Sequence, residues 1–279
     1  MLNSSPRQSG YSKSYARTEA ARLRLVAVVE EMRRRRGGLM DFIPRVARGY
    51  TRPEHLAAVA SLFERAFAGE PVFACVSVPP RHGKTEMVLA AIAWWLSRRP
   101  EDALGYVSYA SAFAESKSSR GRDYATAAGV QLHPSRNTLS EWRTTAGGGL
   151  LATGIGGPLT GQGVRLAVVD DPVKNREEAE SALIRQRTWD WFTSTLWTRI
   201  EPGGSCIVVH TRWHEDDLIG RLARGEMGDA AQWEVVNLPA VDEHGEALWP
   251  SRWPLSELAK KRVANEYDWH SLFMGAPRA

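Results

Sequence analysis

The 279-residue sequence predicts an α/β protein with a mostly parallel central sheet flanked by helices. From Phe73 onward, apolar β-type runs alternate with helix-periodic segments, which is the pattern of consecutive strand and helix units. The runs at 72–78 and 164–170 are almost continuously apolar, as in strands that are buried on both faces. The run at 164–170 ends in acid, at the edge where α/β sheets bind ligands.

The expected elements follow one another along the chain. Residues 1–20, rich in Ser, Arg and Gly, predict a flexible arm, and a helix is expected from about Ala20 to Arg36. Another helix is expected near 54–68. The alternation that follows predicts strands at 72–78, 103–109, 164–170, 204–210 and 232–238, a strand pair around 138–154, and helices at 84–97, 111–127, 176–199 and 216–224.

The composition allows one sizeable core, since 43% of the residues are hydrophobic. We expect a basic N-terminal arm and helix at 1–49, an α/β core at 50–239 and a small lid at 240–279. The lid region is rich in Trp and Pro and predicts short helices. The Gly-rich stretch 147–163 is expected to form a turn-dense hairpin and a loop before the next strand.

The composition also narrows the class of protein. The longest apolar stretch, 87–96, is far shorter than the roughly 20 residues that a bilayer requires. No signal-peptide pattern is present, so we expect a soluble intracellular protein with no membrane partner. Cys75 and Cys206 lie in buried-strand patterns and are expected to be reduced core residues.

The distribution of charge is uneven. A formal net charge of +4 does not by itself identify a nucleic-acid-binding protein. Four consecutive arginines stand at 33–36, and Lys117, Arg120 and Arg122 form a second group on an expected helix. Both clusters could neutralise DNA phosphates, although the second group fits a solvated helix face equally well.

The segment 75–89 has the architecture of a phosphate-binding P-loop, because a strand runs through Pro-Pro-Arg-His-Gly-Lys-Thr into a helix. Gly83 lets the backbone approach a phosphate closely. Lys84 can reach the β- and γ-phosphates, and the Thr85 hydroxyl can bind Mg²⁺. Val78 stands where this motif ordinarily has its first glycine. The segment therefore predicts a nucleotide site.

Two acids end the apolar strand at 164–170. Asp170 is placed to hold Mg²⁺, and Asp171 is placed to orient or deprotonate an attacking water. Alone, this segment would fit a strand followed by an Asp-Pro turn. Together with Lys84 and Thr85 it completes one mechanism.

A polar residue also follows the strand at 204–210. We expect Thr211 to sense the γ-phosphate or the attacking water. Asp216 or Asp217 is expected to cap the helix that starts near Leu218. The two roles are compatible, because the cap does not use Thr211.

Three blocks together resemble the large terminase subunit of tailed bacteriophages, a DNA-packaging motor. They are residues 79–86, residues 160–163 with 168–179, and residues 210–218, and the resemblance spans about 50–275. It implies a RecA-like ATPase domain that binds ATP and Mg²⁺ through a variant P-loop.

The resemblance also implies roles for individual residues. Arg81 shares the phosphate-binding work of Lys84, and His82 and Glu86 belong to the same ATP-binding block. Arg52 and His55 lie in a segment similar to the family's adenine-contacting segment, with simple helix capping as an equal alternative.

This chain departs from the family at the position of the general base. Many P-loop motors place Glu after the magnesium-binding Asp, whereas this chain has Asp171. Glu177 and Glu178 are alternative bases, although Asn175 followed by Glu178 also fits a capping pair. The transition-state arginine is a second open question, for which Arg165, Arg143 and Arg212 are candidates, with Gln162 at a position where relatives can carry arginine.

The expected activity is in-line attack of water on the γ-phosphate of ATP, coupled to stepwise movement of double-stranded DNA. The resemblance implies a homo-oligomeric ring, a portal protein and a small terminase subunit as partners, in the host cytoplasm and transiently on the procapsid. The family's nuclease domain of RNase H-like fold would follow residue 279, so we expect no DNA cleavage. The alternatives are a helicase-like or remodelling ATPase, a metabolic P-loop kinase and a non-catalytic nucleotide-gated subunit.

Overall fold

The computed structural model describes residues 37–159, 161 and 163–278. The chain divides into two units, Met1–Gly38 and Leu39–Ala279, and the second unit carries the fold described below. The predicted arm, the helix up to Arg36 and the arginines at 33–36 lie outside the described residues, as does Gln162. The predicted boundary at residue 50 stays a prediction.

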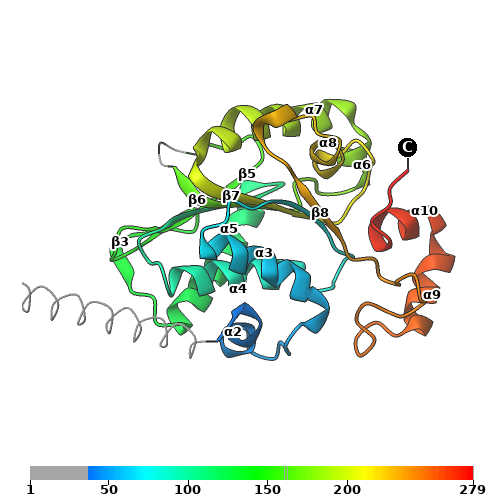
Figure 1. The fold of residues 1–279 in the computed structure, drawn as a ribbon, viewed down its shortest axis with the longest axis horizontal. Helices are drawn as coiled ribbons and strands as arrows, with labels where there is room; N and C mark the ends of the chain where they lie inside the picture. Colours follow the sequence, from blue (N-terminus) through cyan, green and yellow to red (C-terminus); the bar gives the residue numbers. More distant parts are fainter. Residues whose placement is uncertain (1–36, 160, 162, 279) are drawn as a thin grey trace, which may run out of the picture. The chain divides into compact units, whose positions relative to one another are not determined.

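One sheet of eight strands forms the centre of the second unit (Figure 1). The strands are β1 (Phe73–Ser77), β2 (Ala103–Ser108), β3 (Leu132–Asn137), β4 (Glu141–Thr144), β5 (Gly149–Gly154), β6 (Val164–Asp170), β7 (Ile200–His210) and β8 (Glu234–Asn237). Their spatial order is β3-β4-β5-β2-β6-β7-β1-β8. Every pairing is parallel except the two made by β4, so the predicted α/β class with a mostly parallel sheet is confirmed.

Helices cover both faces of the sheet (Figure 1). One layer holds α2 (Leu39–Val46), α3 (Ala57–Ala68), α4 (Lys84–Leu96) and α5 (Ser111–Ala127), and the other holds α6 (Arg176–Glu180), α7 (Ala182–Trp191) and α8 (Leu218–Ala223). Such coverage explains why the central strands are nearly continuous apolar runs.

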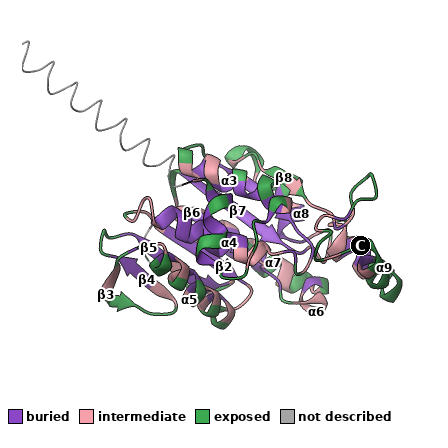
Figure 2. Ribbon diagram, turned by 90° about the horizontal axis from the view of Figure 1, so that it is seen from below, coloured by how far each residue is buried: buried purple, intermediate pink, exposed green. Residues whose placement is uncertain are grey.

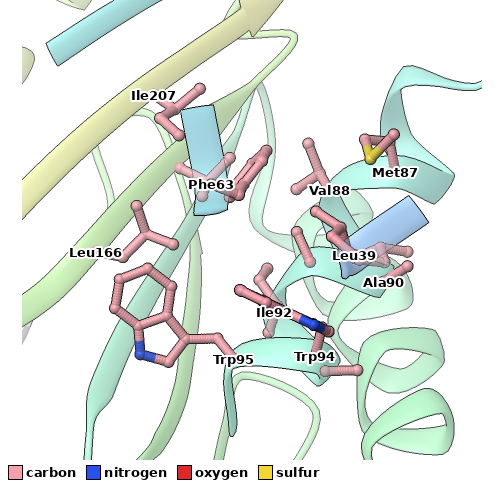
Figure 3. Close-up of a cluster of buried hydrophobic side chains, with 14 of the residues drawn as sticks. Leu39, Phe63, Met87, Val88, Ala90, Ile92, Trp94, Trp95, Leu166 and Ile207 are labelled. Carbon is pink, nitrogen blue, oxygen red and sulfur yellow. The ribbon is translucent and has the colours of Figure 1, made fainter. Parts of the chain in front are cut away.

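The main core lies between the sheet and the layer around α4. Residues 87–96 of α4 are all buried, so this helix is apolar on every side. Figure 3 shows side chains of α3, α4 and the strands β6 and β7 gathered in this core, including Phe63, Ile92 and Leu166. Figure 2 shows the same concentration of buried residues in the central strands. The P-loop helix is therefore held rigidly against the sheet.

A second core lies on the opposite face. It joins β1, β6 and β7 to α8 and to the segment around Phe192. Cys75 and Cys206 are buried there with free thiols, as predicted, and burial raises the pKa of both thiols. Within the described residues, no helix is long and apolar enough to cross a membrane.

Some elements differ from the predictions. The predicted strand pair around 138–154 is present as β4 and β5, but the edge strand β3 before it was not predicted. Pro134 is tolerated in β3 because it is an edge strand. The predicted helix at 176–199 is divided at Ser181, whose side chain caps α7 by accepting a hydrogen bond from the Ile184 N–H. Asp217 caps α8 as predicted, accepting from the Gly220 N–H at 2.8 Å.

The C-terminal segment has its own small core beside the layers (Figure 1). It contains α9 (Leu255–Ala264) and α10 (Glu266–Asp268), and α10 continues into a π-helical turn, Trp269–Phe273. Ala240, Leu258 and Trp269 are buried against one another. This segment therefore packs separately from the main core.

Replacing Trp95 with alanine should lower the free energy of unfolding by about 3–5 kcal/mol. Trp95 is fully buried in α4, and its indole N–H donates to Asp102 Oδ2 at 2.7 Å, so truncation leaves a cavity and an unpaired acceptor. Urea unfolding would measure the change. Leu183→Ala, at a site 59% exposed, is the control and should cost less than about 0.5 kcal/mol. A similar small loss for Trp95→Ala would contradict the described core.

Candidate functional site

The carboxyl ends of three neighbouring strands bring the predicted site together. Ser77 at the end of β1 pairs with His210 at the end of β7, and Val209 of β7 pairs with Asp170 of β6. These strand ends are therefore level. Because of this register, the loop after β1, the acids after β6 and Thr211 after β7 meet at one edge of the sheet.

The loop between β1 and α4 is shaped for anion binding. Arg81 has a φ of 59° and Gly83 a φ of 88°, both in the left-handed region. Left-handed residues in a turn of this kind point successive backbone N–H groups into one concavity, where an anion can bind. Val78, at the position of the missing first glycine, is buried and donates its N–H to the His210 carbonyl at 3.2 Å. The loop is therefore hydrogen-bonded to β7 at Val78, the residue that replaces the usual first glycine of the motif.

Gly83 is required by space as well as by its φ. A β-carbon at this position would lie 1.7 Å from the hydroxyl oxygen of Tyr50. That hydroxyl donates to the Gly83 carbonyl at 3.4 Å. Burial and the charge of Glu86 raise the pKa of Tyr50 to about 12, so the hydroxyl stays protonated at neutral pH. Any larger side chain at position 83 would push Tyr50 out of the site.

Lys84 and Asp171 form an ion pair at the mouth of the loop. The Lys84 Nζ lies 2.8 Å from Asp171 Oδ2, and the two side chains are only 11% and 24% exposed. Burial alone would lower the pKa of Lys84, but the charges of Asp171 and Asp170 outweigh it and the pKa is raised. Lys84 is therefore a fixed cation.

Asp171 is held in an unusual conformation. Its φ is 49°, its N–H donates to the Val209 carbonyl, and its carbonyl accepts from the Tyr109 N–H. Its Oδ1 accepts from the Thr211 N–H at 2.9 Å and lies 3.2 Å from His210 Nδ1. Burial would raise the pKa of Asp171, but Lys84 and His210 lower it well below its usual value. This carboxylate stays ionised.

Asp170 has the opposite electrostatic character. It is fully buried, and desolvation together with the charge of Asp171 raises its pKa to about 6. Tyr106 donates to its Oδ2 at 2.9 Å, and the Thr85 hydroxyl also interacts with this carboxylate. The buried Oδ1 has no hydrogen-bond partner among the described groups. A carboxylate oxygen without a partner beside a hydroxyl fits a magnesium site.

Thr211 closes the site from the side of β7. It is 6% exposed, and its hydroxyl donates to the Val78 carbonyl at 3.2 Å. The Thr211 backbone N–H thus contacts Asp171, and its side chain contacts the start of the P-loop.

A cleft of about 1100 Å³ opens beside the P-loop. Gly83, Lys84 and Thr85 line it on one side, and residues 46–51 and α5 line it on others. Its charged lining consists of six cations, Arg48, Arg81, Lys84, Lys117, Arg120 and Arg252, and two acids, Glu86 and Asp123. The excess of positive charge suits a polyanion.

The two histidines of the prediction contact the backbone of the P-loop and do not line the cleft. His55 Nε2 is 2.9 Å from the His82 carbonyl, and the His82 Nδ1 is 2.9 Å from the Pro80 carbonyl. His82 is fully buried, and burial lowers its pKa to about 4, so it is neutral at physiological pH. Glu86 accepts hydrogen bonds from Tyr124 and Arg120 of α5. It therefore ties the first turn of α4 to α5.

Other predicted residues lie away from this site. Arg52 pairs with Asp41 and Glu54 and does not line the cleft. Arg165 is at the other end of β6, where it donates to the Pro202 carbonyl.

The alternative candidates are also engaged elsewhere. Arg143 pairs with Glu141 on β4, and Arg212 makes two hydrogen bonds to Asp217. Glu178 caps α6 together with Asn175, as the alternative interpretation predicted. In the basic group on α5, Lys117 and Arg120 line the cleft, whereas Arg122 bonds to Asn137.

Sequence reasoning missed several contributors. Tyr50, Tyr106 and His210 each touch a predicted site residue, and Trp249 and Arg252 reach the cleft from the C-terminal segment. Tyr106 lies in the predicted strand at 103–109, and the sheet order places that strand beside the Asp-Asp strand. Nothing in the local sequence places Trp249 and Arg252 at the P-loop.

Known proteins resemble this chain over most of its length. The family model described as "Terminase large subunit, T4likevirus-type, N-terminal" matches residues 75–277. The large terminase of bacteriophage HK97 superposes with a TM-score of 0.58 and 12% identity, over 86% of this chain and 54% of that one. A mutant ATPase domain of the Thermus phage P74-26 large terminase gives a TM-score of 0.51 and 13% identity, over 75% of this chain and 89% of that one. A comparison with curated proteins found no match.

These likenesses differ in what they establish. The two solved structures have low identity and show the fold, which is that of RecA-like terminase ATPase domains. The chain spans about half the length of the HK97 large terminase. The family model matches well over half of the chain, including the P-loop, both acids and Thr211. This chain therefore belongs to the terminase large-subunit family of the T4likevirus type, whose N-terminal part it matches.

Proposed function

We propose that this chain hydrolyses ATP and that hydrolysis drives double-stranded DNA into a viral procapsid. One observation carries the proposal. A lysine and a hydroxyl at the start of α4 meet two adjacent carboxylates at the end of β6, which are the groups that phosphoryl transfer requires. Membership of the terminase family supports the coupling to DNA packaging.

Asp170 and Thr85 would hold Mg²⁺. When bound, the ion neutralises charge on phosphate oxygens. Lys84 would leave Asp171 for the β- and γ-phosphate oxygens, while the N–H groups of the loop at 81–83 bind the phosphates. Two protein ligands suffice, because magnesium sites of this kind are completed by phosphates and water. Within the described residues, no group of three or more metal-ligating His, Cys, Asp or Glu side chains is present.

Asp171 is our choice for the residue that orients the attacking water. Its Oδ1 is fixed by His210 and the Thr211 N–H, so departure of Lys84 would leave Oδ2 available. Glu178 is already engaged as a capping residue, and Glu177 is exposed. Thr211, held between Asp171 and the P-loop, is placed to sense whether the γ-phosphate is present.

The transition-state arginine is proposed to come from a neighbouring subunit. Arg165, Arg143 and Arg212 are each engaged away from the cleft of their own chain, so any of them would have to act across an interface. A homo-oligomeric ring on the procapsid in the host cytoplasm, with portal protein and small terminase subunit as partners, is the assembly that family membership supports. The expected lack of nuclease activity stays a prediction.

Lys84→Ala should reduce ATP turnover at least about 100-fold, because it removes the cation that is held against Asp171 at the start of α4. Wild-type turnover should rise when linear double-stranded DNA is added. Phosphate release with and without DNA measures both effects, and Lys260→Ala, at an exposed residue of α9, is the control. Near-normal turnover in Lys84→Ala, with loss in Arg81→Ala, would transfer the role to Arg81. Strand unwinding by the wild type would favour a helicase.

Replacing Asp170 and replacing Asp171 should impair different steps of the reaction. Asp170→Asn should weaken magnesium-dependent ATP binding, since it removes the metal's carboxylate. Asp171→Asn should preserve binding and stop hydrolysis, since Asn tolerates the positive φ but does not accept a proton from water. Calorimetric titration and single-turnover hydrolysis separate the two steps. Equal loss of binding in both variants would contradict this division of roles.

Tyr106→Phe should shift the pH dependence of magnesium-dependent nucleotide binding. The raised pKa of Asp170, about 6, means that the metal's carboxylate is protonated as the pH falls through that value. The Tyr106 hydroxyl lowers this pKa, so its removal should move the loss of binding upward by about one pH unit. Tyr109→Phe is the matched control, as its hydroxyl bonds to neither acid in the described structure. An unshifted profile would show that Tyr106 does not tune Asp170.

A further inference from the structure

The C-terminal segment contacts the P-loop through one turn, residues 249–253. The N–H groups of Arg252 and Trp253 both donate to the Trp249 carbonyl, at 3.1 and 2.8 Å, which closes the turn. The Trp253 indole N–H donates to the Arg81 carbonyl at 3.4 Å, and its ring stacks on His82 at 5.8 Å. The turn therefore sits directly on the phosphate-binding loop.

Trp249 faces the cleft from the same turn. Its ring stacks on His55, with ring centres 4.4 Å apart and an interplanar angle of 23°. His55 in turn contacts the His82 carbonyl. Two aromatic contacts thus fix the orientation of the turn relative to the nucleotide side of the P-loop.

The turn at 249–253 places Arg252 in the lining of the cleft. Its guanidinium lies over the Trp249 ring, 5.4 Å from the ring centre, and its side chain lines the cleft with Gly83 and Lys84. The charge of Arg252 counteracts the raised pKa of Tyr50, whose hydroxyl touches Gly83. The guanidinium therefore acts on groups at the phosphate-binding loop itself.

Arg252 is also available for an anionic ligand. In the described part of the chain no carboxylate pairs with it, whereas Arg120 in the same cleft pairs with Glu86. Arginine presents a planar fork of donors that matches phosphate oxygens. A stacked guanidinium at the P-loop, without a carboxylate partner, is suited to that ligand.

We propose that Arg252 is a nucleotide-binding residue, whose guanidinium contacts the phosphates of the ATP held by the P-loop. This inference rests on the proposed function. It gives the C-terminal segment a direct contact with the substrate, so occupancy of the cleft is transmitted to that segment through the turn at 249–253.

Calorimetric titration of the purified chain with adenosine, ADP and the ATP analogue adenosine 5′-(β,γ-imido)triphosphate, each with Mg²⁺, tests the proposal. Arg252→Met keeps an unbranched side chain against Trp249 but removes the charge. It should weaken binding of ADP and the analogue about tenfold or more and leave adenosine binding unchanged. Arg252→Lys should restore part of the affinity. Arg262→Met, in the last turn of α9, is the matched control and should bind as the wild type.

Each outcome decides one question. Unchanged binding in Arg252→Met, with loss in Lys84→Ala, would overturn the role of Arg252 and leave the proposed ATPase function standing. Unchanged binding in Lys84→Ala and in Arg81→Ala as well would overturn the proposed function. Equal weakening of adenosine and of the analogue would mean that Arg252 acts only by packing on Trp249, which also overturns the proposal. If Arg252→Met melts at a lower temperature than wild type, Arg252→Gln repeats the comparison.

Discussion

The buried ion pair between Lys84 and Asp171 is the interaction on which the rest of the site depends. It joins the first residue of α4 to the residue after β6, and it forms only because β1 and β6 both neighbour β7 in the sheet. Removing one partner of a buried pair leaves an uncompensated charge and costs about 3–5 kcal/mol. Every other contact at this edge either fixes one of the two partners or surrounds them. The sheet order is thus a requirement of the chemistry as well as of packing.

Two residues with strained backbones, Arg81 and Asp171, lie at this ion pair. Arg81 and Asp171 are the only non-glycine residues with positive φ in the described chain, and the left-handed conformation costs a non-glycine residue roughly 1–2 kcal/mol. Asp171 is kept there by hydrogen bonds to Val209 and Tyr109, and the Arg81 carbonyl accepts from Trp253. Strain of this kind persists where surrounding structure over-determines the backbone, and it gathers at functional sites. Here it flanks the space where phosphates would bind.

The sequence predicted what depends on local pattern. The apolar runs, the P-loop and the Asp-Asp end located the sheet edge and its charged groups, because strand register then carries them together. Helix α2 was missed, although Leu39, Ile43 and Val46 have helical spacing, because Pro44 and short length weaken the signal. Trp249 and Arg252 were beyond prediction, since their position depends on how a separately packed segment folds back onto the P-loop.

Adjacent carboxylates with opposite pKa shifts give the site a means of responding to its substrate. One lysine cannot neutralise both acids, and Lys84 contacts Asp171, so the pKa of Asp171 falls while that of Asp170 rises to about 6. Lys84 also lowers the pKa of Asp170, but burial and the charge of Asp171 outweigh it. In the proposed mechanism, phosphates draw Lys84 away from Asp171, which removes the largest influence lowering its pKa. Asp171 thus becomes a stronger base only when the nucleotide is in place, because the ion pair with Lys84 otherwise keeps its pKa low.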